Sequence, residues 1–195
     1  MKRLMFIVVL FCALVLAAGS ALAVSLSLVP SHQQISLGGT AVVDLVVGGL
    51  GDFAPESLGG FFVDITYDPS ILAISDGDVI FGSYLGDPSF DALSYVDTSA
   101  AGVVHLDETS FLFPDDLDAL QPDMFSLATL AFEGIGYGYS SLDFQIADLS
   151  DAFGFSFENV TTTGAKVSVP EPAIMLLLGT GLIGLAGFRR KLRKA

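Results

Sequence analysis

The chain has 195 residues and a mass of 20.4 kDa, which is enough for one domain once segments at its two ends are set aside. It contains 22 acidic and 8 basic residues and has a formal charge of -14 at pH 7. Between Val24 and Val169 the only base is Lys166. Because phosphate contacts need clustered Lys and Arg side chains, this composition excludes nucleic-acid binding.

The first 23 residues have the three parts of a secretory signal. Lys2 and Arg3 form the charged region, Leu4 to Ala18 is an apolar run, and the segment ends in an A-x-A site at Ala21 and Ala23. The apolar run is shorter than the roughly 20 residues of a membrane-spanning helix. We therefore expect export by the Sec machinery and cleavage before Val24.

The central part of the chain has an alternation of apolar and polar residues with period two, which predicts β-strands. The last strand is expected within Thr161–Val169, and Pro114–Leu120 is the one expected helical turn. The predicted strands are 24–28, 43–47, 61–67, 79–81, 93–96, 103–106, 125–131, 142–146 and 165–169. The residues expected to share an apolar face are Phe125, Leu127, Thr129 and Ala131 in one strand, and Leu142, Phe144 and Ile146 in another.

Turn signals separate these runs, among them Gly38-Gly39, Asp68-Pro69 and Asp87-Pro88. About nine strands at such short spacing indicate an all-β domain with two packed sheets. The chain contains 16 Phe residues, which supply bulk for a core that has no disulfide to brace it, because its only cysteine, Cys12, lies in the signal segment.

The tail combines a Pro-rich motif, an apolar run and a basic cluster. Val169-Pro170-Glu171-Pro172 is followed by the apolar run Ala173–Phe188, which as a helix is roughly 24 Å long. The basic end would stay on the cytoplasmic side of the inner membrane, with the acidic domain on the other side. The tail therefore predicts a transient membrane helix, residues 173–188, next to a processing site. The basic residues are Arg189, Arg190, Lys191, Arg193 and Lys194.

These three parts, in this order, resemble the PEP-CTERM sorting signal of Gram-negative bacteria over residues 169–195. The resemblance implies that an exosortase, a membrane-embedded cysteine protease, processes the chain at the motif. Its substrates reach the cell surface or the extracellular polysaccharide matrix, so the resemblance also implies a biofilm setting.

The core carries a second resemblance. The run GGFFVDITYDPSIL, residues 59–72, is similar to a cohesin segment in which a strand ends at Tyr-Asp-Pro. The runs VIFGSYLGD (79–87), SLATLAFEG (126–134) and DLSDAFG (148–154) continue the cohesin pattern in order. The resemblance implies a cohesin-like jelly-roll sandwich over residues 24–168. Cohesins bind dockerin domains through one flat sheet face, and related carbohydrate-binding modules share the framework.

No catalytic arrangement stands out, and we expect no enzyme activity and no required cofactor. His32 and His105 are the only histidines, and no G-x-S-x-G nucleophile motif is present. Clusters of Asp in loops are the type of ligand that calcium prefers, although none has EF-hand spacing. The calcium candidates are Asp76, Asp78, Asp115, Asp116, Asp118, Asp148 and Asp151.

The sequence therefore predicts a non-catalytic, exported protein with a binding or adhesion role in an exopolysaccharide setting. The partner is either a dockerin-like surface protein or the exopolysaccharide itself. In a carbohydrate-binding module, exposed tyrosines would stack on sugar rings. A third alternative is a passive matrix protein whose acidic surface supplies charge and hydration. The tyrosines are Tyr67, Tyr84, Tyr95, Tyr137 and Tyr139.

Overall fold

The computed structural model describes residues 23–172, 178, 180 and 181. The predicted basic tail, the predicted signal segment up to residue 22 and all but three residues of the predicted membrane helix lie outside these residues. The described chain forms twelve strands, one 3-10 helix and one α-helix in the central domain. In chain order they are β1 (Ser25–Val29), β2 (His32–Gln34), β3 (Thr40–Gly48), β4 (Leu58–Thr66), β5 (Leu72–Ala73), η1 (Asp76–Asp78), β6 (Val79–Phe81), β7 (Ala92–Asp97), β8 (Val103–Ser110), α2 (Pro114–Leu120), β9 (Met124–Gly134), β10 (Gly138–Asp151), β11 (Thr161–Thr163) and β12 (Ala165–Val169).

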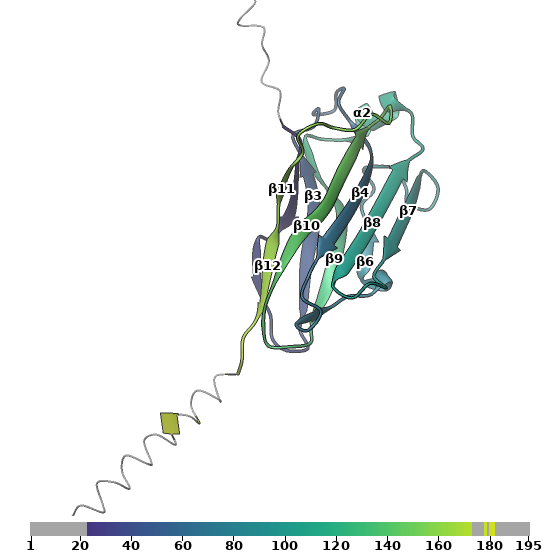
Figure 1. The fold of residues 1–195 in the computed structure, drawn as a ribbon. Helices are drawn as coiled ribbons and strands as arrows, with labels where there is room; N and C mark the ends of the chain where they lie inside the picture. Colours follow the sequence, from purple (N-terminus) through teal and green to yellow (C-terminus); the bar gives the residue numbers. More distant parts are fainter. Residues whose placement is uncertain (1–22, 173–177, 179, 182–195) are drawn as a thin grey trace, which may run out of the picture.

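The strands form two sheets that pack face to face (Figure 1). The first sheet has the order β11-β1-β3-β9-β5, and β6 also pairs with β9. The second has the order β2-β12-β10-β4-β8-β7. The predicted all-β sandwich is therefore confirmed, and the three additional strands β2, β5 and β11 are only two or three residues long.

The core lies between the sheets and follows the predicted alternation. Val43 and Leu45 of β3 are fully buried, as are Val63 and Ile65 of β4. Because each strand turns every second side chain inward, the two sheets bury one continuous apolar cluster. The largest fully buried aromatic ring, Phe132, meets the ring of Tyr67 edge-on at 5.5 Å between centroids.

The predicted apolar faces of β9 and β10 are correct up to a register shift in each strand and wrong beyond it. In β10, the shift between Phe144 and Ile146 places Ile146 opposite Asp64, on the outer side of the sheet. In β9, a shift beside Leu127 means that Leu130 and Phe132 point inward where Thr129 and Ala131 were expected. An extra residue in one strand reverses the faces of all the residues that follow it.

The predicted last strand, Thr161–Val169, also differs from the structure, because it divides at Gly164. The first part, β11, pairs in parallel with β1 of the first sheet, and β12 pairs with β10 and β2 of the second. A Cβ atom on Gly164 would lie 2.4 Å from the carbonyl oxygen of Leu142. Only glycine therefore lets the chain pass so close to β10 as it changes sheets.

Helix α2 confirms the expected helical turn and lies at the end of the sandwich opposite the point where the chain leaves β12 (Figure 1). Pro114 opens the helix, and Gln121 follows it. The buried Gln121 side chain accepts a hydrogen bond from the Leu58 N–H at 2.7 Å and donates from Nε2 to the carbonyls of Leu58 and Tyr84. It therefore joins three separate loops at this end.

One carboxyl group is buried in the domain. Glu108 of β8 has no exposed surface, its Oε1 accepts a hydrogen bond from the Ser94 hydroxyl at 2.7 Å, and its Oε2 has no partner. Burial raises the pKa of Glu108 to about 7, from an ordinary value of 4.5. Between about pH 4.5 and 7, Glu108 is therefore mostly protonated in the folded protein and mostly ionised in the unfolded chain.

We expect Glu108 to make the protein less stable as pH rises. Its contribution is greatest below pH 4.5, is lost as pH rises through about 7, and amounts to about 3 kcal/mol over that window. Replacing Glu108 by Gln should remove this part of the pH dependence of the free energy of unfolding, measured by urea denaturation from pH 4 to 8. The exposed Glu133→Gln variant is the control, and an unchanged pH slope in Glu108→Gln would contradict the assignment.

Candidate functional site

The outer side of the second sheet, across β7, β8, β4 and β10, presents a surface that combines apolar and acidic side chains. Strand pairing places Tyr95, Asp107, Phe62 and Asp148 in one row across the four strands. The neighbouring row has Asp97, His105, Asp64 and Ile146. These eight residues together with Leu93, which lies beside Tyr95 on β7, are called the sheet face below.

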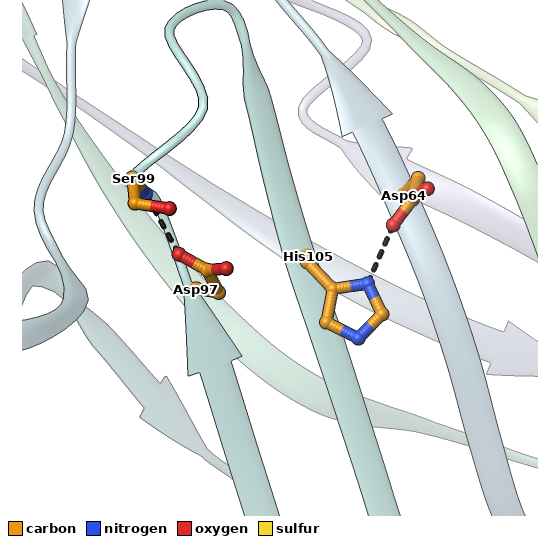
Figure 2. A network of polar contacts seen from close by, with 4 residues as sticks. All are labelled: Asp64, Asp97, Ser99 and His105. Carbon is orange, nitrogen blue, oxygen red and sulfur yellow. Dashed lines mark hydrogen bonds and ion pairs between the residues drawn. The ribbon is translucent and has the colours of Figure 1, made fainter.

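The centre of the sheet face is a histidine held between two aromatic rings. The His105 ring lies 4.5 Å from the ring of Phe62 and 5.8 Å from that of Tyr95, edge-on in both cases. On β4, Asp64 Oδ1 lies 2.6 Å from His105 Nδ1. Figure 2 shows the Asp64 carboxylate turned toward the imidazole ring. The carboxylate therefore orients the imidazole ring between its two aromatic neighbours.

Asp97 lies on the other side of His105, at the end of β7 (Figure 2). Its carboxylate accepts a hydrogen bond from the Ser99 N–H at 2.8 Å. Hydrogen bonds from the side chain and the backbone of Ser99, with a smaller attraction from His105, hold the pKa of Asp97 below its usual range. Asp97 is therefore a fixed negative charge at the edge of the sheet face nearest the β7–β8 turn.

Large apolar side chains of the sheet face are open to solvent. Leu93 is 64% exposed and Tyr95 is 55% exposed, while Phe62 and Ile146 are exposed to a smaller degree. A shallow groove of about 190 Å³ runs beside Phe62, between Asp107 of β8 and Asp148 of β10. The sheet face therefore combines exposed apolar side chains with interspersed carboxylates on paired strands, which is suited to contact a complementary protein surface.

The calcium candidates occupy separate places. The Asp76 carboxylate accepts hydrogen bonds from Thr98, the Asp78 carboxylate from Ser75. Asp118 accepts from the Ser57 hydroxyl, and Asp151 accepts from the N–H groups of Phe153 and Phe155. Asp115 and Asp116 lie in the first turn of α2, and Asp148 is on the sheet face. Within the described part of the chain, no three His, Cys, Asp or Glu side chains are grouped to hold a metal ion, and calcium binding stays a prediction.

The sorting motif continues directly from the last core strand. Val169 is fully buried and pairs with Gly138 at the end of β12, whereas Pro170, Glu171 and Pro172 are exposed. Pro170 and Pro172 line one side of a groove of about 450 Å³, whose other side is the β2–β3 connection and Tyr137. The fold thus includes the first residue of the motif and leaves the Pro-Glu-Pro segment accessible.

The five tyrosines do not form a common platform. Tyr67 packs in the core, Tyr84 stacks on Phe125 at the α2 end, and Tyr95 is on the sheet face. Tyr137 lines the groove beside the motif, and the Tyr139 ring lies 3.9 Å from the Lys166 ammonium group.

Only one of the five tyrosines, Tyr95, lies on the sheet face, so the tyrosines of the sequence did not reveal where this face is. A usable signal was present in the sequence, because Phe62 and Asp64 alternate with the inward residues of β4. The strands that lie beside β4, and so complete the face, are set by the topology.

Residues 168–191 match the PEP-CTERM protein-sorting motif. No curated protein matches the chain in sequence. Among the described residues, no helix has the length and apolar character needed to span a membrane. The motif marks the chain as one that is exported and held at a membrane in transit.

The described domain is similar in structure to cohesins. A cohesin from Clostridium acetobutylicum is 22% identical with a TM-score of 0.58, over 76% of this chain and 91% of that one. The sixth cohesin of Acetivibrio cellulolyticus scaffoldin B, solved in complex with a Cel5 dockerin mutant, is 13% identical with a TM-score of 0.60, over 75% and 99%. A non-cellulosomal cohesin from the archaeon Archaeoglobus fulgidus is 15% identical with a TM-score of 0.57, over 76% and 92%. The chain therefore combines a cohesin-like jelly-roll sandwich with a PEP-CTERM sorting motif.

Proposed function

We propose that this protein is a non-catalytic docking module that is exported, sorted by an exosortase and placed on the cell surface or in the exopolysaccharide matrix. It binds a partner protein through the sheet face. The observation that carries this proposal is the group of exposed apolar residues beside the Phe62–His105–Tyr95 ring contacts, on a domain with a cohesin-like fold.

The composition of the sheet face supports a protein partner. Exposed Leu93 and Tyr95 supply the apolar contact area that commonly dominates binding energy at protein interfaces. The row of Tyr95, Phe62 and their acidic neighbours comes from paired strands, so binding requires little ordering of the surface. Several cohesins with this fold were solved in complex with dockerins, which favours a dockerin-like partner here.

The charge of the sheet face specifies the partner further. Asp64, Asp97, Asp107 and Asp148 are interspersed with its apolar residues, and His105 is its only group that can become positive. A partner with Lys or Arg residues around an apolar contact is therefore complementary, and salt should weaken the attraction.

The sorting motif supports the location. Sec export would bring the domain across the inner membrane, and the tail would hold it there until the exosortase acts at Pro170-Glu171-Pro172. The accessible motif suits this order of events, since the domain can be fully folded when it is processed. Release would then leave the acidic domain on the surface or in the matrix.

We expect the substitutions Leu93→Ser and Tyr95→Ser, made together, to weaken capture of a secreted polypeptide from the native organism at least tenfold, because both side chains lose their apolar contact. The measurement is the Kd of the purified captured polypeptide for the wild-type chain and the variant, at low and high salt. Tyr139→Ser, an exposed tyrosine of β10 outside the sheet face, is the matched control. Saturable capture of polysaccharide alone would favour a carbohydrate-binding module, and capture of neither would favour a passive acidic matrix protein.

The overlap between core and motif leads to a separate prediction. Replacing Pro170 and Pro172 by Ala should block tail processing, seen as a larger mass and retention at the membrane, without lowering the melting temperature. Val169→Ala should instead lower the free energy of unfolding by about 2 kcal/mol, because it leaves a cavity in the core. Normal processing of the Pro170/Pro172 variant would contradict the exosortase assignment and leave the docking proposal untouched.

A further inference from the structure

The end of the sandwich opposite the sorting motif exposes a group of phenylalanine rings. They lie in the four loops that connect strands at the α2 end, residues 49–57, 82–91, 111–123 and 152–160. Each of these rings is between 60% and 81% exposed. They are called the distal Phe cluster: Phe53, Phe90, Phe111, Phe113, Phe153 and Phe155.

Backbone hydrogen bonds join these loops into one surface. The Phe53 N–H donates to the carbonyl of Gln121 at 2.9 Å, and the Phe111 N–H donates to that of Asp91 at 2.7 Å. The Ala152 N–H bonds the carbonyl of Ser57 at 3.1 Å, which connects the fourth loop to the first. These bonds therefore hold the backbones of the loops together at this end of the sandwich.

The turn that carries Phe153 and Phe155 illustrates how the rings are directed outward. Both N–H groups donate to one carboxylate oxygen of Asp151, at 2.9 and 2.8 Å. The Asp151 N–H in turn bonds the carbonyl of Phe155 at 2.8 Å. This closed set of hydrogen bonds fixes the backbone, while the two rings stay in solvent.

Summed over the four loops, the distal Phe cluster exposes a large apolar area. Six phenylalanine rings at these exposures present roughly 800 Å² of apolar area. Large exposed apolar surfaces of this kind often mark binding sites. About 800 Å² is also the area that each partner contributes to a standard protein interface.

The charge of the same loops limits which kind of partner can bind the distal Phe cluster. Every charged side chain in them is a carboxylate, and the only base of residues 24–169, Lys166, lies on β12. Anionic lipids, acidic polysaccharides and the same cluster of a second copy would all be repelled. The surrounding carboxylates would give no electrostatic attraction to an uncharged apolar partner. Carboxylates of these loops include Asp52, Glu56, Asp115, Asp116, Asp123 and Glu158.

We propose that the distal Phe cluster binds a cationic amphipathic protein segment, in which Lys or Arg residues flank a row of apolar side chains. The apolar row covers the phenylalanine rings, and the basic residues reach the surrounding carboxylates. This site is separate from the sheet face, and it lies at the opposite end from the sorting motif (Figure 1). The distal Phe cluster would therefore lie away from the membrane, accessible to a partner, while the tail holds the protein there.

The test uses the full chain in nanodiscs of zwitterionic lipid and an 18-residue amphipathic helix of Leu and Lys as the probe, with titration calorimetry as the readout. We expect saturable, salt-sensitive binding with a stoichiometry of one peptide. Two double variants should each weaken binding at least tenfold: Phe90→Ser with Phe113→Ser, and Phe153→Ser with Phe155→Ser. All four side chains are exposed, so the melting temperature should not change.

Matched variants separate this site from general attraction to an acidic protein. Leu93→Ser with Tyr95→Ser on the sheet face should leave peptide affinity unchanged, and Asp115→Asn with Asp116→Asn should weaken binding and reduce its salt dependence.

Several outcomes would overturn the proposal: no binding of the Leu/Lys helix, equal binding of a Leu/Glu helix, or unchanged affinity in both Phe variants. The wild-type protein could instead bind phosphatidylcholine vesicles or a neutral glucan more strongly than the peptide. If the Phe variants lost that binding, the surface would be assigned to lipid or glycan, and the proposal would be overturned as well.

Discussion

Every feature of this protein depends on the burial of alternate side chains between two sheets. The described domain contains no cysteine and a single base, so neither disulfides nor a network of ion pairs contributes to its stability. Pairing of β3 with β9 and of β4 with β10 and β8 places Leu45, Ile65 and Phe132 in one apolar layer. The same alternation sends the intervening side chains outward, and the inner packing therefore decides which residues are available for function.

This constraint gives the molecule three distinct regions. The sheet face is rigid because its residues belong to paired strands, and the Asp64–His105 contact orders its aromatic centre. The distal Phe cluster lies on loops that Gln121 and the neighbouring backbone bonds hold together. The sorting motif begins within the core at Val169, so the folded domain and the processing site share a residue. Binding surfaces and membrane attachment are thereby kept at different places on one small domain.

Much of the fold could be predicted from local patterns, and the errors have specific causes. Alternation located the strands and the sandwich, and Pro114 followed by acidic residues located α2. The inner faces of β9 and β10 were wrong beyond their register shifts, since a bulge depends on the partner strand. The sheet face was missed because its residues come from four strands that are neighbours only in the folded sheet. The exposed phenylalanines were counted toward the core, since composition alone does not distinguish a loop ring from a buried one.

The sequence by itself determined the acidic domain, the strand pattern and the sorting motif at 168–191, because each of these is encoded in residues that are adjacent along the chain. The tertiary structure alone decided that Ile146 faces outward, that the chain changes sheets at Gly164, and that His105 lies between Phe62 and Tyr95. It also decided that loops far apart in the sequence meet at Gln121. These features depend on which strands pair and in what register, and that choice is made by packing across the whole core.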